Sequence, residues 1–140
     1  MGVFVPPRYH IVGRLDLETR GLLLLSIDGE LTQRLLHPKR GVEREYIAIV
    51  EGAPGQELIP RIAAGIETGV GLAQGEILSI QENEIRLIMR EGRNRIVRRM
   101  LHNAGHSVVD LFRVRFGPFE LEDLEEGELR PASFEEGNTL

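Results

Sequence analysis

The sequence of 140 residues contains no cysteine. Disulfide bonds, cysteine-ligated zinc and thiol nucleophiles are therefore excluded, and the absence fits a reducing compartment. No run approaches the roughly 18 consecutive apolar residues that a membrane-spanning helix needs. Residues 1–4 also lack the basic and apolar regions of a secretion signal. We therefore expect a soluble cytoplasmic protein without membrane contact, and the 41% hydrophobic content suits a single domain of this length.

Patterns that indicate several enzyme classes are also missing. The sequence has no phosphate-binding P-loop and no GxGxxG, and no serine has the glycine neighbours of a nucleophile elbow. Its four histidines lack a ligand spacing supported by nearby carboxylates. His102 and His106 are four residues apart, but Gly105 between them indicates a helix end. We expect no metal site and no hydrolase triad.

Charge is distributed unevenly along the chain. The net charge of −5 argues against nucleic-acid binding, yet residues 86–115 carry eight arginines against Glu91 and Asp110, a local charge of +6. Residues 120–140 carry eight acids against Arg130, a local charge of −7. Only one of the 17 basic residues is a lysine. Arginine suits bidentate phosphate contacts and stacking on bases, although codon bias produces the same preference.

One stretch organises the chain. Asp16 lies in a short segment between Gly13 and Gly21, followed by four consecutive leucines. Such a run predicts a buried strand at 22–27, so the segment before it is expected to be a loop fixed on a sheet. The loop then presents the Asp16 carboxylate to a site. The simpler alternative is that Asp16 accepts backbone amides in an Asx-turn.

The order of predicted elements indicates a mixed α+β domain. Helices are expected at 30–36, 56–66 and 96–101, with Ile96, Val97, Met100 and Leu101 as the buried stripe of the last. The strands that alternation predicts, besides 22–27, are 44–50, 76–80, 85–90, 107–116 and 119–121, with a further edge at 129–132. Residues 1–10 read as an extended lead-in, and 135–140 as a frayed tail. We expect a largely antiparallel sheet with two to three helices against it.

Three features together point to chemistry on a nucleotide within RNA. A buried aspartate stays ionised only beside a cation, and an arginine partner would keep Asp16 ready as a nucleophile or base. Tyr46 on an interior strand offers a ring against which a base can pack. The arginine-dense helix start can hold phosphates. The alternatives are that Tyr46 belongs only to the core, and that Arg95 and Arg99 lie on a solvated helix face.

The sequence resembles the ribosomal pseudouridine synthases of the RsuA/RluB type over residues 9–132. The motifs that carry the resemblance are Gly13-Arg14-Leu15-Asp16, Thr19-x-Gly21-Leu22-Leu23-Leu24-Leu25, Asp28-Gly29, Arg44-Glu45-Tyr46, Glu91-Gly92-Arg93-Asn94-Arg95-Ile96-Val97-Arg98-Arg99-Met100, Gly105-His106 and Arg113-x-Arg115-x-Gly117. Their number and order make the match specific, whereas the first motif alone would be weak.

The resemblance implies roles for individual residues. Asp16 matches the catalytic aspartate of uridine isomerisation, acting either on C1′ or on a ribose proton. Tyr46 matches the tyrosine that packs on the base, and Arg98 the basic residue that pairs with the aspartate. No cofactor or metal is implied. The expected partner is ribosomal RNA, with large-subunit RNA favoured over small-subunit RNA. The residues expected to bind it are Arg14, Arg44, Arg93, Arg95, Arg99, Arg113 and Arg115.

The sequence departs from the family pattern in three ways. Arg44 stands where lysine is usual, and Ile96 stands where glutamine is common. The family's S4 RNA-binding domain and the opening strand of its catalytic domain are not found, so residues 1–140 are interpreted as a truncated catalytic domain. The rival interpretation is a non-catalytic RNA-binding fragment. A missing strand would also expose a sheet edge, through which two copies could dimerise.

Overall fold

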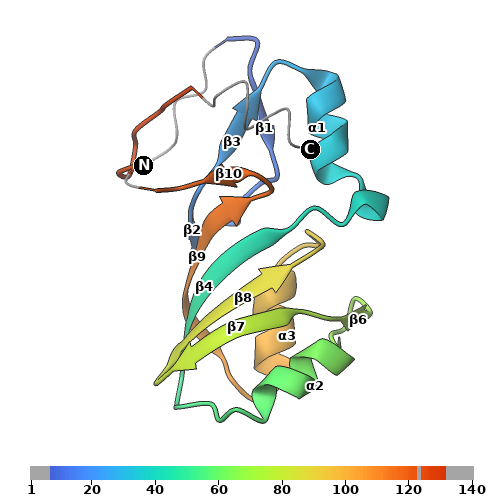
Figure 1. Ribbon diagram of the computed structural model, residues 1–140, viewed down its shortest axis with the longest axis vertical. Coiled ribbons are helices and arrows are strands. Elements are labelled where there is room, and N and C mark those ends of the chain that lie inside the picture. Colours follow the sequence, from blue (N-terminus) through green and yellow to red (C-terminus); the bar gives the residue numbers. More distant parts are fainter. Residues whose placement is uncertain (1–6, 123, 132–140) are drawn as a thin grey trace.

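The computed structural model describes residues 7–122 and 124–131, and its main feature is a sheet with three helices (Figure 1). In order across this sheet lie β10 (Phe119–Glu120), β9 (Val108–Phe116), β4 (Arg44–Val50), β8 (Glu84–Met89) and β7 (Glu76–Gln81). These neighbours are all antiparallel, whereas β2 (Thr19–Gly21) pairs with β9 in parallel. The predicted α+β class with a mixed, largely antiparallel sheet is confirmed.

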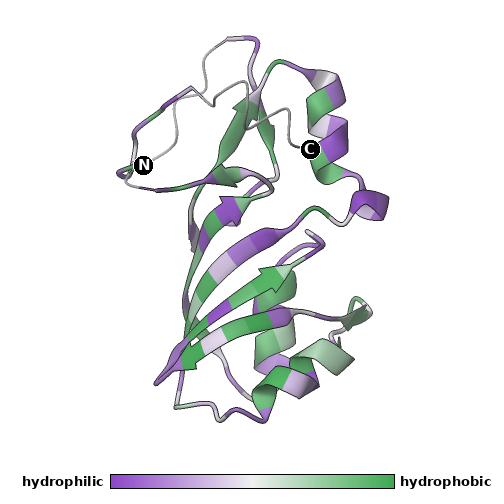
Figure 2. Ribbon diagram, viewed as in Figure 1, coloured by the Kyte–Doolittle hydropathy of each residue, from purple (hydrophilic) through white to green (hydrophobic). Residues whose placement is uncertain are grey.

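The larger core lies between this sheet and two helices, α2 (Leu58–Ala64) and α3 (Ile96–Asn103). Alternation along β4 places Tyr46, Ala48 and Val50 on one buried face. The predicted stripe of α3 packs against that face, and all four of its residues are buried. Figure 2 shows the corresponding apolar bands on these elements. The apolar patterns of β4 and α3 therefore meet in one core.

A smaller second unit of structure adjoins the C-terminal end of β9 (Figure 1). It comprises β1 (His10–Val12) paired with β3 (Leu24–Ser26), helix α1 (Gly29–Leu36) and the 3₁₀ turn η1 (Pro38–Arg40). Val12, Leu22, Leu35, Phe116 and Phe119 form its core. Because Phe116 is the last residue of β9, this core is tied directly to the main sheet.

The prediction of a buried strand at 22–27 is wrong. β3 is shorter, pairs only with β1 among the described strands, and leaves Leu24 and Leu25 half-buried. The preceding residues enter the main sheet instead, because Gly21 lets β2 approach β9 closely. A Cβ on Gly21 would overlap the main chain of Arg113. The leucine run thus leads from one sheet to the other.

The other element boundaries agree in part with the sequence. Helix α2 is shorter than 56–66 because Pro60 fits only its first turn and Ile66 joins a small ribbon of β5 (Ile66–Glu67) and β6 (Leu72–Ala73). The predicted edge strand at 129–132 does not form over 129–131. The predicted tail at 135–140 and residues 1–6 of the lead-in lie outside the described residues.

No helix within the described residues is long and apolar enough to cross a bilayer.

The outer strand β7 ends the main sheet, and its pairing with β8 shifts register between Ile77 and Ser79. Such irregularities hinder edge-to-edge pairing. Dimerisation through an open edge stays a prediction.

Candidate active site

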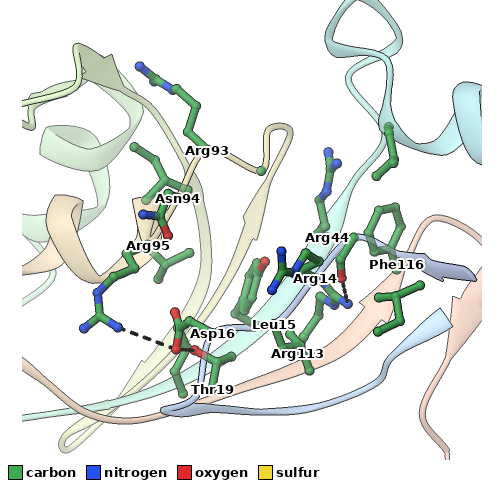
Figure 3. Close-up of a pocket in the computed structure, with 18 residues that line it drawn as sticks. Arg14, Leu15, Asp16, Thr19, Arg44, Arg93, Asn94, Arg95, Arg113 and Phe116 are labelled. Atoms are coloured by element: carbon green, nitrogen blue, oxygen red, sulfur yellow. Dashed lines mark hydrogen bonds and ion pairs between the residues drawn. The ribbon is translucent and has the colours of Figure 1, made fainter. Parts of the chain in front are cut away.

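A pocket of about 740 Å³ opens where the smaller unit meets the main sheet (Figure 3). The loop that carries Asp16 forms one wall, and the loop before α3 forms the facing wall. Tyr46 of β4 and Arg113 of β9 also line the pocket. Residues far apart in the sequence are therefore brought to one cavity by the register of two adjacent strands, in which Tyr46 stands opposite Arg113.

The Asp16 side chain is fixed by its own turn. Its Oδ1 accepts hydrogen bonds from the Glu18 amide (3.0 Å) and the Thr19 hydroxyl (2.9 Å), and the Thr19 amide donates to the Asp16 carbonyl oxygen (3.1 Å). The Asx-turn that the sequence allowed is therefore present. Because Thr19 begins β2, the turn is anchored on the main sheet.

Two arginines approach the same carboxylate oxygen. Arg95 Nη1 lies 3.7 Å from Asp16 Oδ1, and Arg98 Nε lies 4.0 Å from it. The Arg98 side chain is only 10% exposed, its Nη2 donates to the Glu18 carbonyl oxygen (2.7 Å), and its buried Nε has no hydrogen-bond partner among the described residues. Arg98 therefore lies at the outer limit of an ion pair with Asp16, without a direct hydrogen bond, and its role as the partner of the catalytic aspartate stays a prediction.

The second carboxylate oxygen of Asp16 accepts no hydrogen bond within the described part of the chain. Both hydrogen bonds to the carboxylate go to Oδ1. The Asp16 side chain is 23% exposed on the pocket wall. An acceptor oxygen that is rigidly held and unpaired can act as a base or a nucleophile towards a molecule in the pocket.

The pocket floor contains two buried arginines around Phe116. Arg113 is 3% exposed and donates from Nη2 to the Gly13 carbonyl oxygen (2.7 Å) and from Nε to that of Leu22 (3.1 Å). It therefore ties both ends of the Asp16 segment to β9. Burial lowers the pKa of Arg113, and its electrostatic interaction with Tyr46 opposes this shift. Arg44 lies 4.6 Å from the Phe116 ring centre and donates to the Val42 carbonyl oxygen (2.9 Å); burial lowers its pKa too.

The predicted site residues fall into three groups. Those that line the pocket are Arg14, Asp16, Arg44, Tyr46, Arg93, Arg95 and Arg113. Arg98 and Arg99 line a neighbouring pocket, which shares Arg95 with the first. Arg115 lies apart from both and is paired with Glu43 (2.9 Å) and Glu45 (3.3 Å). The RNA-binding roles of these arginines, including Arg115, stay predictions.

Sequence reasoning gave no role to two residues that shape the site. Thr19 belongs to a recognised motif, and its spacing of three from Asp16 was the available signal for a side-chain hydrogen bond. Phe116 carries no such signal, because its position under Arg44 and Arg113 depends on strand register. Among the described residues, no three His, Asp or Glu side chains come together as a group that could hold a metal ion.

Comparison with known proteins gives consistent matches. Residues 4–103 match the family described as RNA pseudouridylate synthase. A curated relative from Bacillus subtilis, named ribosomal large subunit pseudouridine synthase B, is 39% identical over 90% of this chain and 54% of its own length. One of the same name from Yersinia pestis is 42% identical over 81% of this chain and 37% of its own length.

A solved structure described as a pseudouridylate synthase superposes with a TM-score of 0.90 at 32% identity. The match covers 96% of this chain and 62% of that one. The chain thus spans about half the length, or less, of these two curated relatives.

Proposed function

The chain belongs to the RNA pseudouridylate synthase family, and from this premise we propose that it converts a uridine of ribosomal RNA into pseudouridine. The names of the B. subtilis and Y. pestis relatives favour large-subunit RNA as the substrate. We assign the reaction to residues 1–140 as one catalytic domain. The single observation that carries the proposal is the fixed Asp16 carboxylate on the wall of the pocket. It is held through Oδ1, while Oδ2 accepts no hydrogen bond from the described residues.

The proposed reaction is an isomerisation, so substrate and product have the same composition. Asp16 Oδ2 starts it, either by attack on C1′ or by removal of a ribose proton, and the C1′–N1 bond breaks. The uracil turns within the pocket and a C1′–C5 bond forms. In the first route the Asp16–C1′ bond breaks as the C1′–C5 bond forms, and in the second the ribose regains its proton, so Asp16 ends as a free carboxylate. The hydrogen on C5 leaves as a proton, while N1 gains one. No electrons enter or leave, so the balance requires neither oxidant nor reductant.

Each neighbouring side chain has a role that its position supports. Tyr46 lies on the pocket floor, 8% exposed, and is proposed to pack against the uracil and assist loss of the C5 proton. Arg98 and Arg95 face Asp16 Oδ1 and compensate its negative charge. Arg14 is exposed on the pocket wall and has no ion pair or hydrogen bond within the described residues, so it is available for an RNA phosphate.

Tritium release tests this function. Ribosomal RNA transcripts labelled with [5-³H]uridine should lose tritium to water in the presence of the wild-type chain, since a C5 glycoside cannot retain that hydrogen. Asp16→Asn should abolish release, because an amide oxygen still accepts at Oδ1 but supplies neither a nucleophile nor a base. Binding of the transcript, measured by filter retention, should be almost unchanged.

Asp110→Asn is the matched control, because Asp110 pairs with Arg20 (2.9 Å) and lines neither pocket. It should release tritium at the wild-type rate. If no transcript releases tritium although RNA is bound, the chain is a non-catalytic RNA-binding fragment. Release by Asp16→Asn at the wild-type rate would contradict the role of Asp16.

A further inference from the structure

A second pocket, of about 560 Å³, is lined in part by Glu18 of the Asp16 turn. Its lining includes three arginines, Arg95, Arg98 and Arg99, together with His102 and Ser107, and its single acidic residue is Glu18. Arg95 lines both pockets, so the two cavities adjoin across this side chain. The excess of guanidinium groups makes the second pocket suited to an anion.

Several donors in this pocket are unused. Arg99 donates only from Nε, to the Asn94 carbonyl oxygen (3.1 Å), so both terminal nitrogens lack a partner within the described residues. The His102 ring is oriented by contact of Nδ1 with the Ser107 hydroxyl (2.9 Å), and Nε2 has no partner there. In contrast, Arg95 is paired with Glu18 (3.2 Å), so the free donors are concentrated on the α3 side, at Arg99 and His102.

We propose that this second pocket binds the phosphodiester adjacent to the target uridine, with Arg99 and His102 as its donors. The proposal rests on the proposed function, which places the uridine in the first pocket. A nucleotide turned out of the RNA stays covalently linked to its neighbours, so the backbone leaves the first pocket over one of its walls. The wall formed by Arg95 and the Asp16 turn leads directly to the unused donors.

Holding this phosphate fixes the position of the ribose relative to Asp16. The Arg98 side chain connects the two sites, because it contacts Glu18 in the turn, lies 4.0 Å from Asp16 and lines the second pocket. An RNA chain that spans both cavities would therefore place one defined nucleotide at the carboxylate. The second pocket thereby fixes the spacing between the bound phosphate and the nucleotide at Asp16, without reading the base sequence.

Salt-dependent binding of a fluorescein-labelled oligouridylate tests the proposal independently of catalysis. The logarithm of the binding constant falls with the logarithm of salt concentration by about 0.7 for each phosphate contact to a single strand. Arg99→Gln should therefore reduce the slope by about 0.7, and Arg99→Lys should restore it. Arg61→Gln is the control, because Arg61 is exposed on α2 and lines neither pocket.

Ser107→Tyr distinguishes a phosphate bound inside the pocket from long-range attraction of the RNA by the arginines. The tyrosine side chain fills the cavity without changing the charge of the protein. We expect it also to reduce the slope, with unchanged urea midpoints for all variants. If Arg99→Gln keeps the wild-type slope, or if only Ser107→Tyr keeps it, the phosphate does not occupy this pocket. If the wild type releases no tritium while both slopes fall, the proposed function fails and the phosphate site stands.

Discussion

Thr19 helps to hold the Asp16 carboxylate through one of its two oxygens, Oδ1. Its hydroxyl donates to Oδ1, and a hydrogen bond to a charged group contributes roughly 1.5–3 kcal/mol. Thr19→Val keeps the shape of the side chain but removes this donor. We expect kcat for tritium release to fall by about tenfold to a hundredfold, if most of that free energy serves positioning.

Thr19→Ser is the matched rescue variant, because it restores the hydroxyl without the methyl group. It should recover most of the lost kcat, and the KM for RNA should be similar in all three proteins. Because Thr19 is buried, its methyl group also packs against neighbours. A fall in kcat that serine does not rescue would assign the effect to that packing rather than to the hydroxyl.

Asp16, Tyr46 and Arg98 could be named as candidate site residues from the sequence, since their motifs can be recognised without knowledge of the fold. The structural contacts of Arg113 could not be predicted in this way. Its expected RNA-binding role stays a prediction, but the structure also shows its guanidinium bonded to the carbonyl oxygens of Gly13 and Leu22. Those contacts depend on the pairing of β2 with β9, which no local pattern encodes.

At the scale of elements, predictability follows the strength of the periodic signal. The bounds of β4 were predicted as 44–50, because seven residues of alternation and an apolar stretch define them. The hairpin of β7 and β8 and the buried stripe of α3 were also predicted correctly. β2 and β3 were not, because strands of three residues carry too short a pattern and the leucine run looked like a buried strand.

The close approach of β2 to β9 makes Gly21 a test of how the active-site loop is supported. Gly21 has φ +114, and a Cβ there would overlap the Arg113 main chain. Gly105 has a similar φ of +101, but a Cβ on this residue would meet no atom within 4 Å. An alanine at either site costs about 1–2 kcal/mol for its backbone conformation alone.

Gly21→Ala should therefore lower the free energy of unfolding by more than Gly105→Ala, as measured by urea denaturation. It should also reduce tritium release, because separation of β2 from β9 displaces the Asp16 turn. Gly105→Ala should keep wild-type kcat. Equal losses of stability in the two variants would mean that β2 moves away from β9 without cost, and that the pairing does not hold the loop.

Over the whole molecule, we expect the acidic end of the chain to oppose the approach of the proposed RNA substrate to the arginines. The net charge is −5, and Glu122 and Glu126 are both exposed in the described part of that end. Replacing both with glutamine changes the net charge to −3. Charges that are far apart still attract or repel through solvent at low salt. The double glutamine variant should therefore associate with oligouridylate faster than the wild type at low salt, as measured by stopped-flow fluorescence.

The increase should disappear near 1 M salt, where the screening length is only about 3 Å. The pair Glu122→Asp and Glu126→Asp keeps both charges, so it should associate at the wild-type rate at every salt concentration. The dissociation rate should change little in either double variant, since neither glutamate lines a pocket. A faster association that persists at high salt would show that these side chains block the site sterically rather than by their charge.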